Sequence, residues 1–262
     1  MDSRDVAVHW ERNAETWTRT TRAGHDVYRD ALNTPSFLAM LPPVKGLKGL
    51  DVGCGEGANT RKIAEQGARM TGIDIAPTFI RHARQAETET PLGIDYQEAD
   101  AHLLPFEDAC FDFATAFMSL MDMPRQDRAL AEIYRVLRPG GFLQFSILHP
   151  CFVPPKRRNV RDGKGTVRAV QVADYFNEVD GQVDTWLFSD IPEEERARLE
   201  PFTVPRFHRT LTSWVAMICG AGFVIQAFGE PRASDDTARK YPLVADTQVT
   251  PIFLHVRAGR PS

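Results

Sequence analysis

The sequence has few cysteines, no long apolar run and no excess of positive charge. Its four cysteines, at positions 54, 110, 151 and 219, show no Cys-x-x-Cys spacing, which argues against a structural zinc site or a disulfide framework. No apolar run approaches the roughly 18–20 residues that span a bilayer, and the stretch MDSRDVAVHWERNAE lacks the apolar core of a signal peptide. We therefore expect a cytoplasmic protein that has no membrane partner and no metal site.

The charge balance argues against nucleic acid as a partner. Lys and Arg number 31 and Asp and Glu number 35, for a formal net charge of -4, so the overall field does not favour nucleic acid. A content of 43% hydrophobic and 25% charged residues is that of an ordinary globular protein. The composition leaves the oligomeric state open between monomer and homodimer.

Strand and helix patterns alternate through the middle of the chain. We expect strands at 47–53, 69–75, 93–100, 110–117 and 142–148, and helices at 58–67, 76–86 and 125–137. Five such alternations with short loops predict a parallel, doubly wound α/β sheet. Further helices are expected at 6–17, 27–41 and 212–222, and two strands at 223–229 and 252–258 that pair antiparallel at the edge of the sheet.

These patterns divide the chain into four segments. They are an N-terminal helical cover (1–45), a cofactor-binding core (46–149), an inserted cap (150–209), and a C-terminal helix and strands that complete the core (210–262). The insertion far exceeds the usual length of a β-α loop, and such insertions commonly form lids or substrate-binding caps. Alternating stretches within it predict one or two antiparallel strands.

The stretch GLDVGCGEGANT (49–60) places Gly53, Gly55 and Gly57 in the first strand-to-helix turn. Ligands of open α/β sheets bind beyond the carboxyl ends of the strands, and a Cβ at these glycines would clash with a ligand that lies against the backbone. A tight turn without a ligand is the alternative. Asp74 ends the next strand, where a carboxylate can accept from both hydroxyls of a ribose or can cap the following helix. The spacing also fits the dinucleotide pattern G-x-G-x-x-G/A.

Acidic residues around this loop favour a cationic ligand over a dinucleotide. Asp51 precedes the loop, Glu56 lies inside it, and Asp100 ends the third strand. Carboxylates repel a pyrophosphate but attract an ammonium or a sulfonium. Asp100 can also accept from an adenine amino group, while the backbone N–H of Ala101 donates to the ring. We therefore expect S-adenosylmethionine as the cofactor rather than NAD.

Four motifs carry a resemblance to a known family. LDVGCGEG, GIDIAP, EADAHLLPFEDACFD and RVLRPGG, in this order and spacing, resemble the class I S-adenosylmethionine-dependent methyltransferases. They are most similar to the ubiquinone/menaquinone-biosynthesis-like branch, which acts on small molecules. The resemblance covers 49–149 strongly and the insertion hardly at all, and it implies a Rossmann-like seven-stranded sheet whose last strand is antiparallel.

The resemblance also implies roles for individual residues. The segment from Asp51 to Gly57, which includes Cys54, holds the methionine moiety; Asp74 and Ile75 hold the ribose and the adenine edge; Asp100 and Ala101 hold the adenine; and the backbone at Ala116 and Phe117 meets the methionine amino group. The N-terminal helices of this family usually fold over the cofactor. Trp10, Trp17 and Tyr28 fit that role or a role in core packing.

Histidines are the candidate bases for methyl transfer to a hydroxyl. His149 ends the fifth strand, and His208 lies just before the returning helix, while His25 in the N-terminal cover is a third candidate. Packed, hydrogen-bonded histidines are the alternative for each. The leading hypothesis is a methyltransferase for a small-molecule acceptor with an oxygen nucleophile. Its rivals are N- or C-methylation, a cofactor-binding protein without catalysis, and an NAD-dependent oxidoreductase.

The cap carries two further features. Its segment 154–168 has six basic residues against one acidic residue, and it is either a solvated loop or a contact for an anionic substrate. Trp186, Phe188, Phe202 and Phe207 form either an aromatic wall for the substrate or the small core of the cap. The absence of NPPY- and DPPY-like stretches and of a Pro-Cys nucleophile disfavours the branches that methylate nucleic acids.

Overall fold

A seven-stranded sheet forms the centre of the computed structural model, which describes all 262 residues. Its strands, in spatial order, are β3 (Asp95–Glu98), β2 (Arg69–Asp74), β1 (Lys48–Val52), β4 (Phe111–Phe117), β5 (Leu137–Leu148), β11 (Phe253–Gly259) and β10 (Val224–Gly229). Neighbours from β3 to β5 are parallel, whereas β11 is antiparallel to both β5 and β10. The predicted Rossmann-like fold, with an antiparallel last strand, is confirmed. The predicted pairing of the last two strands is also present, but β11 lies inside the sheet and β10 forms its edge.

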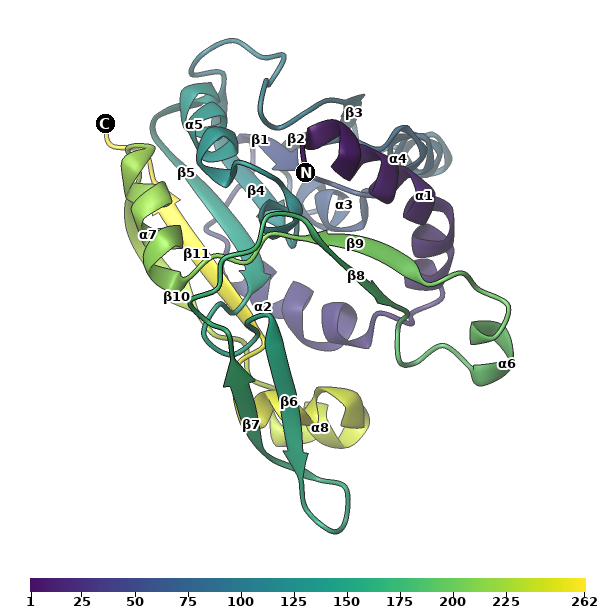
Figure 1. Ribbon diagram of the computed structural model, residues 1–262. Helices are drawn as coiled ribbons and strands as arrows, with labels where there is room; N and C mark the ends of the chain where they lie inside the picture. Colours follow the sequence, from purple (N-terminus) through teal and green to yellow (C-terminus); the bar gives the residue numbers. More distant parts are fainter.

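Helices cover both faces of this sheet (Figure 1). They are α3 (Ala58–Ala64) and α4 (Pro77–Glu89) on one face, and α5 (Gln126–Val136) and α7 (Leu211–Gly220) on the other. Ile63 and Ile80 pack with Phe113 against the first face. Ile133 and Trp214 belong to the larger cluster on the second face. The apolar residues of each helix recur at helical spacing, so one stripe is buried and the opposite face is solvated.

The N-terminal cover begins with a helix that is longer than the expected 6–17. This helix, α1 (Ser3–Arg22), starts earlier because the Asp2 side chain accepts hydrogen bonds from the backbone N–H groups of Arg4 and Asp5. The helix expected at 27–41 runs without a break from 27 to 40, and it contains a π-helical turn, η1 (Arg29–Asn33), followed by α2 (Thr34–Met40). Pro35 near the start of α2 lacks the N–H that a continuous α-helix would need there.

The cap contains two hairpins, which is more than the one or two strands expected. They are formed by β6 (Lys156–Arg161) with β7 (Val167–Ala173), and by β8 (Gln182–Trp186) with β9 (Phe202–Arg206), with the short α6 (Glu193–Arg196) between β8 and β9. Figure 1 shows β8 and β9 crossing in front of the core near α1, while β6 and β7 project from the body beside α8. A small cluster around Phe188 and Phe202 packs against Trp10 and Trp17, so the cap is joined to the N-terminal helix by apolar contacts.

Three short elements complete the chain. They are η2 (Leu120–Asp122), α8 (Asp235–Lys240) and η3 (Pro242–Gln248). None of them was predicted, because such short turns carry no hydrophobic period to detect. None of the helices combines the length and the apolar character that crossing a membrane requires.

Candidate functional site

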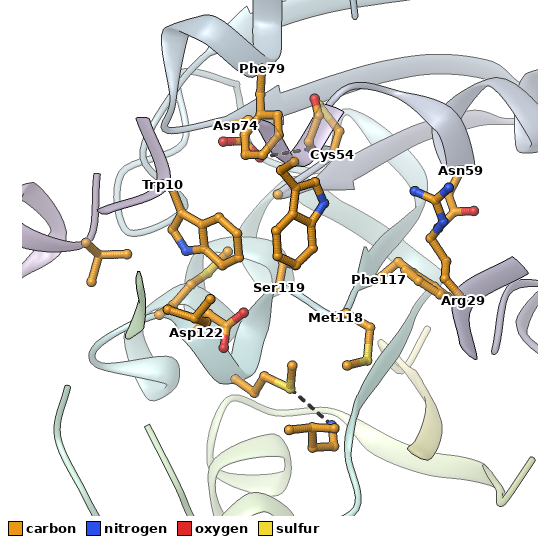
Figure 2. Close-up of a pocket in the computed structure, with 18 of the residues that line it drawn as sticks. Trp10, Arg29, Cys54, Asn59, Asp74, Phe79, Phe117, Met118, Ser119 and Asp122 are labelled. Atoms are coloured by element: carbon orange, nitrogen blue, oxygen red, sulfur yellow. Dashed lines mark hydrogen bonds between the residues drawn. The ribbon is translucent and has the colours of Figure 1, made fainter. Parts of the chain in front are cut away.

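A cavity of about 590 Å³ lies beyond the carboxyl ends of β1, β2 and β4. Its floor includes the glycine loop and the ends of these strands, and its cover includes Trp10 and Trp17 of α1 and Trp186 and Phe188 of the cap. Of its 41 lining residues, 21 are hydrophobic, a composition typical of small-molecule sites, which occupy about 300–1,000 Å³. Figure 2 shows side chains from the core and from α1 converging on this space.

The glycine loop borders the cavity, and the reason why a side chain is disfavoured differs among its three glycines. Gly53, Gly55 and Gly57 all have positive φ, at 73°, 55° and 88°, a region that side chains rarely adopt. A Cβ at Gly53 would lie 2.4 Å from the Cβ of Ser119, and one at Gly57 would lie 2.6 Å from the Tyr96 hydroxyl oxygen. Only at Gly55 would a Cβ meet nothing within 4 Å. The expected clash with a ligand therefore applies to Gly55, whereas protein neighbours explain the other two.

Asp74 holds the glycine loop in place and also lines the cavity. One carboxylate oxygen accepts from the backbone N–H of Gly55 at 2.9 Å, and the other accepts from that of Ala76 at 2.9 Å. Burial raises the pKa of Asp74 to about 6, although these hydrogen bonds act to lower it. The alternative role as a helix cap does not apply, because Ala76 is the N-cap residue of α4. The side chain is thus placed to meet a ligand at the loop.

Asp51 has a mainly structural position. Its side chain is 2% exposed, and its two oxygens accept from the hydroxyls of Thr60 and Thr115 at 2.5 and 2.8 Å. Burial raises the pKa of its carboxyl group. Asp51 therefore links α3 to β4, and although it borders the cavity, both of its carboxylate oxygens already accept hydrogen bonds from the protein.

Glu56 is also paired within the protein. Its carboxylate lies 3.4 Å from Nε of Arg22 and 3.7 Å from Nη1 of Arg29. Both arginines belong to the N-terminal cover, and Arg29 lines the cavity itself. Because two guanidinium groups balance this charge, Glu56 argues less strongly against a phosphate than its position in the sequence suggested.

Asp100 follows the end of β3, at the same edge of the sheet as Asp51 and Asp74. It accepts from the backbone N–H of His102 at 2.9 Å and from the ring Nδ1 at 2.5 Å. Partial burial acts to raise the pKa of Asp100, but the hydrogen bonds from His102 outweigh it and lower that pKa to about 2. Asp100 is therefore a carboxylate at neutral pH, in position to accept from a ligand.

Nine of the ten predicted cofactor residues line this one cavity. They are Asp51, Gly53, Cys54, Gly55, Asp74, Ile75, Asp100, Ala101 and Phe117. The exception is Gly57, which does not border the cavity and whose hydrogen atom faces Tyr96. The strand ends thus bring together residues that lie as far apart in the sequence as Asp51 and Phe117.

The structure does not bring the predicted histidine bases to the cavity. His149, His208 and His25 are all absent from its lining. Nε2 of His149 lies 2.9 Å from a carboxylate oxygen of Glu230, and burial lowers the pKa of His149. Nε2 of His208 donates to the backbone carbonyl of Tyr175 at 2.8 Å. The role of these histidines as bases therefore gains no support from their positions.

Several cavity residues were not identified from the sequence. They include Asp26, Arg29, Asp122, Arg157, Asn159, Asp184, Arg206 and Asp246. Asp122 had a detectable signal, since it is a lone acidic residue in the apolar stretch FMSLMDM just after a strand end. Arg157 and Asn159 lie in the basic segment 154–168, which was noted only as a whole. The remaining residues come from segments without a motif, and only the folded chain brings them to the site.

For the basic segment and the aromatic residues of the cap, the sequence left open a contact with the substrate or a role within the cap itself. The structure places some of these residues at the cavity and others away from it. Within the basic segment, Arg157 lines the cavity, and its Nη2 is buried without a hydrogen bond, 3.7 Å from Asp246. Trp186 and Phe188 also line the cavity, whereas Phe202 and Phe207 are buried outside it.

A cavity at the strand ends of a doubly wound sheet, bordered by a glycine loop and strand-end carboxylates, defines a protein that binds an adenosine-type cofactor. Residues 50–145 match the family described as "Methyltransferase domain". These residues belong to the class I S-adenosylmethionine-dependent methyltransferases, as the four motifs predicted. The cofactor of that family is S-adenosylmethionine, which confirms the predicted cofactor at the level of the family.

Known relatives share this domain. The chain is 44% identical over 117 residues to an O-methyltransferase, cnsE, of Penicillium expansum, covering 42% of each chain. It is 37% identical over 124 residues to the ubiquinone/menaquinone biosynthesis C-methyltransferase UbiE of Brucella anthropi, covering 45% of each. The chain thus spans less than half the length of these two curated relatives.

A solved structure extends the similarity to most of the chain. The crystal structure of an S-adenosylmethionine-dependent methyltransferase from Mesorhizobium loti has a TM-score of 0.69 and 28% sequence identity. The match covers 86% of this chain and 96% of that one. The similarity of fold therefore extends beyond the 96 residues that match the family.

Proposed function

We propose that this protein transfers the methyl group of S-adenosylmethionine to an oxygen atom of a small organic molecule. One observation carries the proposal: the cavity that the predicted cofactor residues line is also bordered by Trp186, Phe188, Arg157 and Phe253, which are not among those residues. A cofactor that contacts Asp74 and Asp100 leaves these other walls for an acceptor. The family match at residues 50–145 supports the same activity.

The residues present fit the cofactor. Gly55 leaves its side of the loop open, and the carboxylates of Asp74 and Asp100 are placed to accept hydrogen bonds from a ribose and an adenine amino group. When bound, the sulfonium of the cofactor supplies an electrophilic methyl carbon and a neutral leaving group. Trp10 and Trp17 then cover the site and exclude water, and the main task of the protein is to hold the acceptor at a short distance.

The acceptor atom separates this proposal from its nearest rivals. An O-methyltransferase and a C-methyltransferase both occur among the relatives, so N- and C-methylation are the first alternatives. A cofactor-binding protein without catalysis would retain binding but methylate nothing in a broad metabolite screen. We further propose a cytoplasmic location and a small-molecule acceptor rather than a nucleic acid, with the oligomeric state to be measured by sedimentation.

Titration calorimetry tests the cofactor part of the proposal. S-adenosylmethionine and its demethylated product, S-adenosylhomocysteine, should both bind the full chain. A dissociation constant weaker than about 1 mM, or about -4 kcal/mol, for both ligands would refute it. NADH fluorescence serves as the counter-test, since an enhancement on mixing would favour the oxidoreductase alternative.

A further inference from the structure

Asp122 lines the same cavity as the predicted cofactor residues and the aromatic residues of the cap. It ends η2, the turn that follows β4. The Ser119 hydroxyl donates to the backbone carbonyl of Val52 at 2.6 Å, and the backbone N–H of Asp122 donates to the carbonyl of Ser119 at 3.0 Å. The residue is 7% exposed, and Figure 2 shows its carboxylate pointing into the cavity near Trp10. The turn therefore aims a buried carboxylate at the ligand space.

Among the carboxylates that line the cavity, Asp122 stands apart because it has no partner. The others are each paired: Asp26 with the backbone of Arg29, Asp51 with Thr60, Glu56 with Arg22, Asp74 with Gly55, Asp100 with His102, Asp184 with Arg206, and Asp246 with Tyr28. The Asp122 side chain accepts no hydrogen bond from the protein. No Lys, Arg or His nitrogen lies within 4.0 Å of its carboxylate oxygens, the longest distance for an ion pair. The charged groups that act on it from a distance are Arg206 and Asp184 of the cap, which oppose each other.

The Asp122 side chain is withdrawn from bulk solvent but faces the cavity, where only water or a ligand can supply a donor. Withdrawal of a carboxylate from bulk solvent carries a cost that a well-placed hydrogen-bond donor offsets. Burial accordingly raises the pKa of Asp122 well above its usual range. A ligand that brings its own hydrogen-bond donor would remove this cost. The donor must lie on the part of the ligand that reaches Asp122.

The walls around Asp122 indicate the rest of that ligand. Its chain neighbours Met121 and Met123 line the cavity, as do Trp10 and Trp186. Thioether and indole groups pack well against an apolar, ring-containing body. The ligand is thus apolar over most of its surface, with a donor at one point.

We propose that Asp122 accepts the hydrogen bond, and then the proton, of a nucleophilic hydroxyl on an acceptor with an apolar, ring-containing body. This proposal rests on the methyl transfer proposed above and adds the acceptor class and the proton acceptor. In the reaction the acceptor oxygen gains the methyl group and the O–H proton passes to the Asp122 carboxylate. The electron pair of the broken carbon–sulfur bond stays on the sulfur, which changes from a sulfonium to a neutral thioether.

Three matched probes test this assignment on the full chain saturated with S-adenosylhomocysteine. They are 4-nitrophenol, its methyl ether 4-nitroanisole, which lacks the donor, and 4-nitrobenzylamine, which carries a cation. At a pH above the raised pKa of Asp122, where its side chain is a carboxylate, the parent protein should bind 4-nitrophenol about tenfold more tightly than 4-nitroanisole, as expected for a hydrogen bond to a charged group. Asp122→Asn should abolish most of this preference, and Asp26→Asn, at another cavity carboxylate, should preserve it.

The colour of the phenolate gives a second readout, which a merely structural role for Asp122 would not change. Bound to the parent protein, 4-nitrophenol should keep its proton to a higher pH than when it is bound to Asp122→Asn, because the carboxylate opposes a second negative charge. Asp122→Asn should bind S-adenosylhomocysteine within about threefold of the parent, which shows that the variant is folded.

The other outcomes contradict either the role of Asp122 or the proposed function. If the parent binds S-adenosylhomocysteine but shows no preference for 4-nitrophenol over its ether, or binds neither, the role of Asp122 is wrong while the proposed function stands. An Asp122-dependent preference for 4-nitrobenzylamine would reassign the site to amines. If S-adenosylhomocysteine does not bind, the proposed function fails, and the role of Asp122 fails with it.

Discussion

Asp51 and Asp74 show how two carboxylates on adjacent strands acquire different roles. Each lies at or near the carboxyl end of its strand, and each is buried. Asp51 faces two threonine hydroxyls on α3 and β4, whereas Asp74 faces the backbone of the glycine loop beside the cavity. Neighbouring groups rather than residue type decide the environment of each carboxylate.

The raised pKa of Asp74 predicts a pH-dependent affinity for the cofactor product. The pKa is raised from 3.8 to about 6 in the folded protein, so Asp74 carries a proton below this pH and accepts poorly from ribose hydroxyls. The affinity for S-adenosylhomocysteine, measured by calorimetry, should therefore increase as the pH rises through about 6 and level off above it. Asp74→Asn should bind about 10- to 100-fold more weakly at neutral pH.

The matched comparison is the pH profile of the variant. Asn cannot ionise, so the component of the profile near pH 6 should be reduced in Asp74→Asn. Asp26 also lines the cavity, and burial raises its pKa to about 6. The pH profile of Asp26→Asn shows how much of the change in affinity near pH 6 comes from Asp26. If the parent and Asp74→Asn show the same affinity and the same profile, Asp74 is not a ligand of the ribose.

At the scale of elements, buried polar links set how strands and helices meet beneath the cavity. The Asp51 carboxylate joins β1 to α3 through Thr60 and to β4 through Thr115. Ser119 joins the start of η2 to the end of β1 through the carbonyl of Val52. These links fix the loop after β1 relative to the turn after β4, and both segments line the cavity.

Thr115→Val tests the contribution of one such link. Valine has nearly the shape of threonine but no hydroxyl, so one oxygen of the buried Asp51 would lose its donor. The free energy of unfolding, measured in urea, should fall by about 1–3 kcal/mol. Thr88→Val, at an exposed helical threonine, should change it by no more than about 0.5 kcal/mol. Equal midpoints for parent and Thr115→Val would mean that Asp51 finds another donor.

On the scale of the whole molecule, the cavity is assembled from segments that are remote in the sequence. The N-terminal helix, the core strands and both cap hairpins each contribute lining residues. The rings of Trp17 and Phe202 lie 4.9 Å apart, and those of Phe188 and Phe202 lie 5.4 Å apart. The cover over the site is therefore one aromatic cluster shared by α1 and the cap.

Phe202→Ala should loosen this cover without unfolding the core. Phe202 is 1% exposed, and truncating a buried phenylalanine costs about 3–5 kcal/mol. Hydrogen exchange should accelerate across β8 and β9, with little change in β1 and β4, and S-adenosylhomocysteine should bind more weakly because Trp17 and Phe188 line the cavity. Phe176→Ala, at a side chain that is 87% exposed, is the control. Uniform acceleration throughout the chain would show that the cap and the core unfold together.

The sequence by itself determined the sheet, the glycine loop and the strand ends that carry Asp74 and Asp100. Hydrophobic periodicity and glycine spacing are local properties, and the carboxyl ends of parallel strands necessarily share one edge. Only the tertiary structure decided which side chains face the cavity. It directed Asp51 towards Thr115, kept His149 and His208 out of the lining, and left Asp122 there without a partner. Such outcomes depend on contacts between segments that lie far apart in the chain, and no local pattern encodes them.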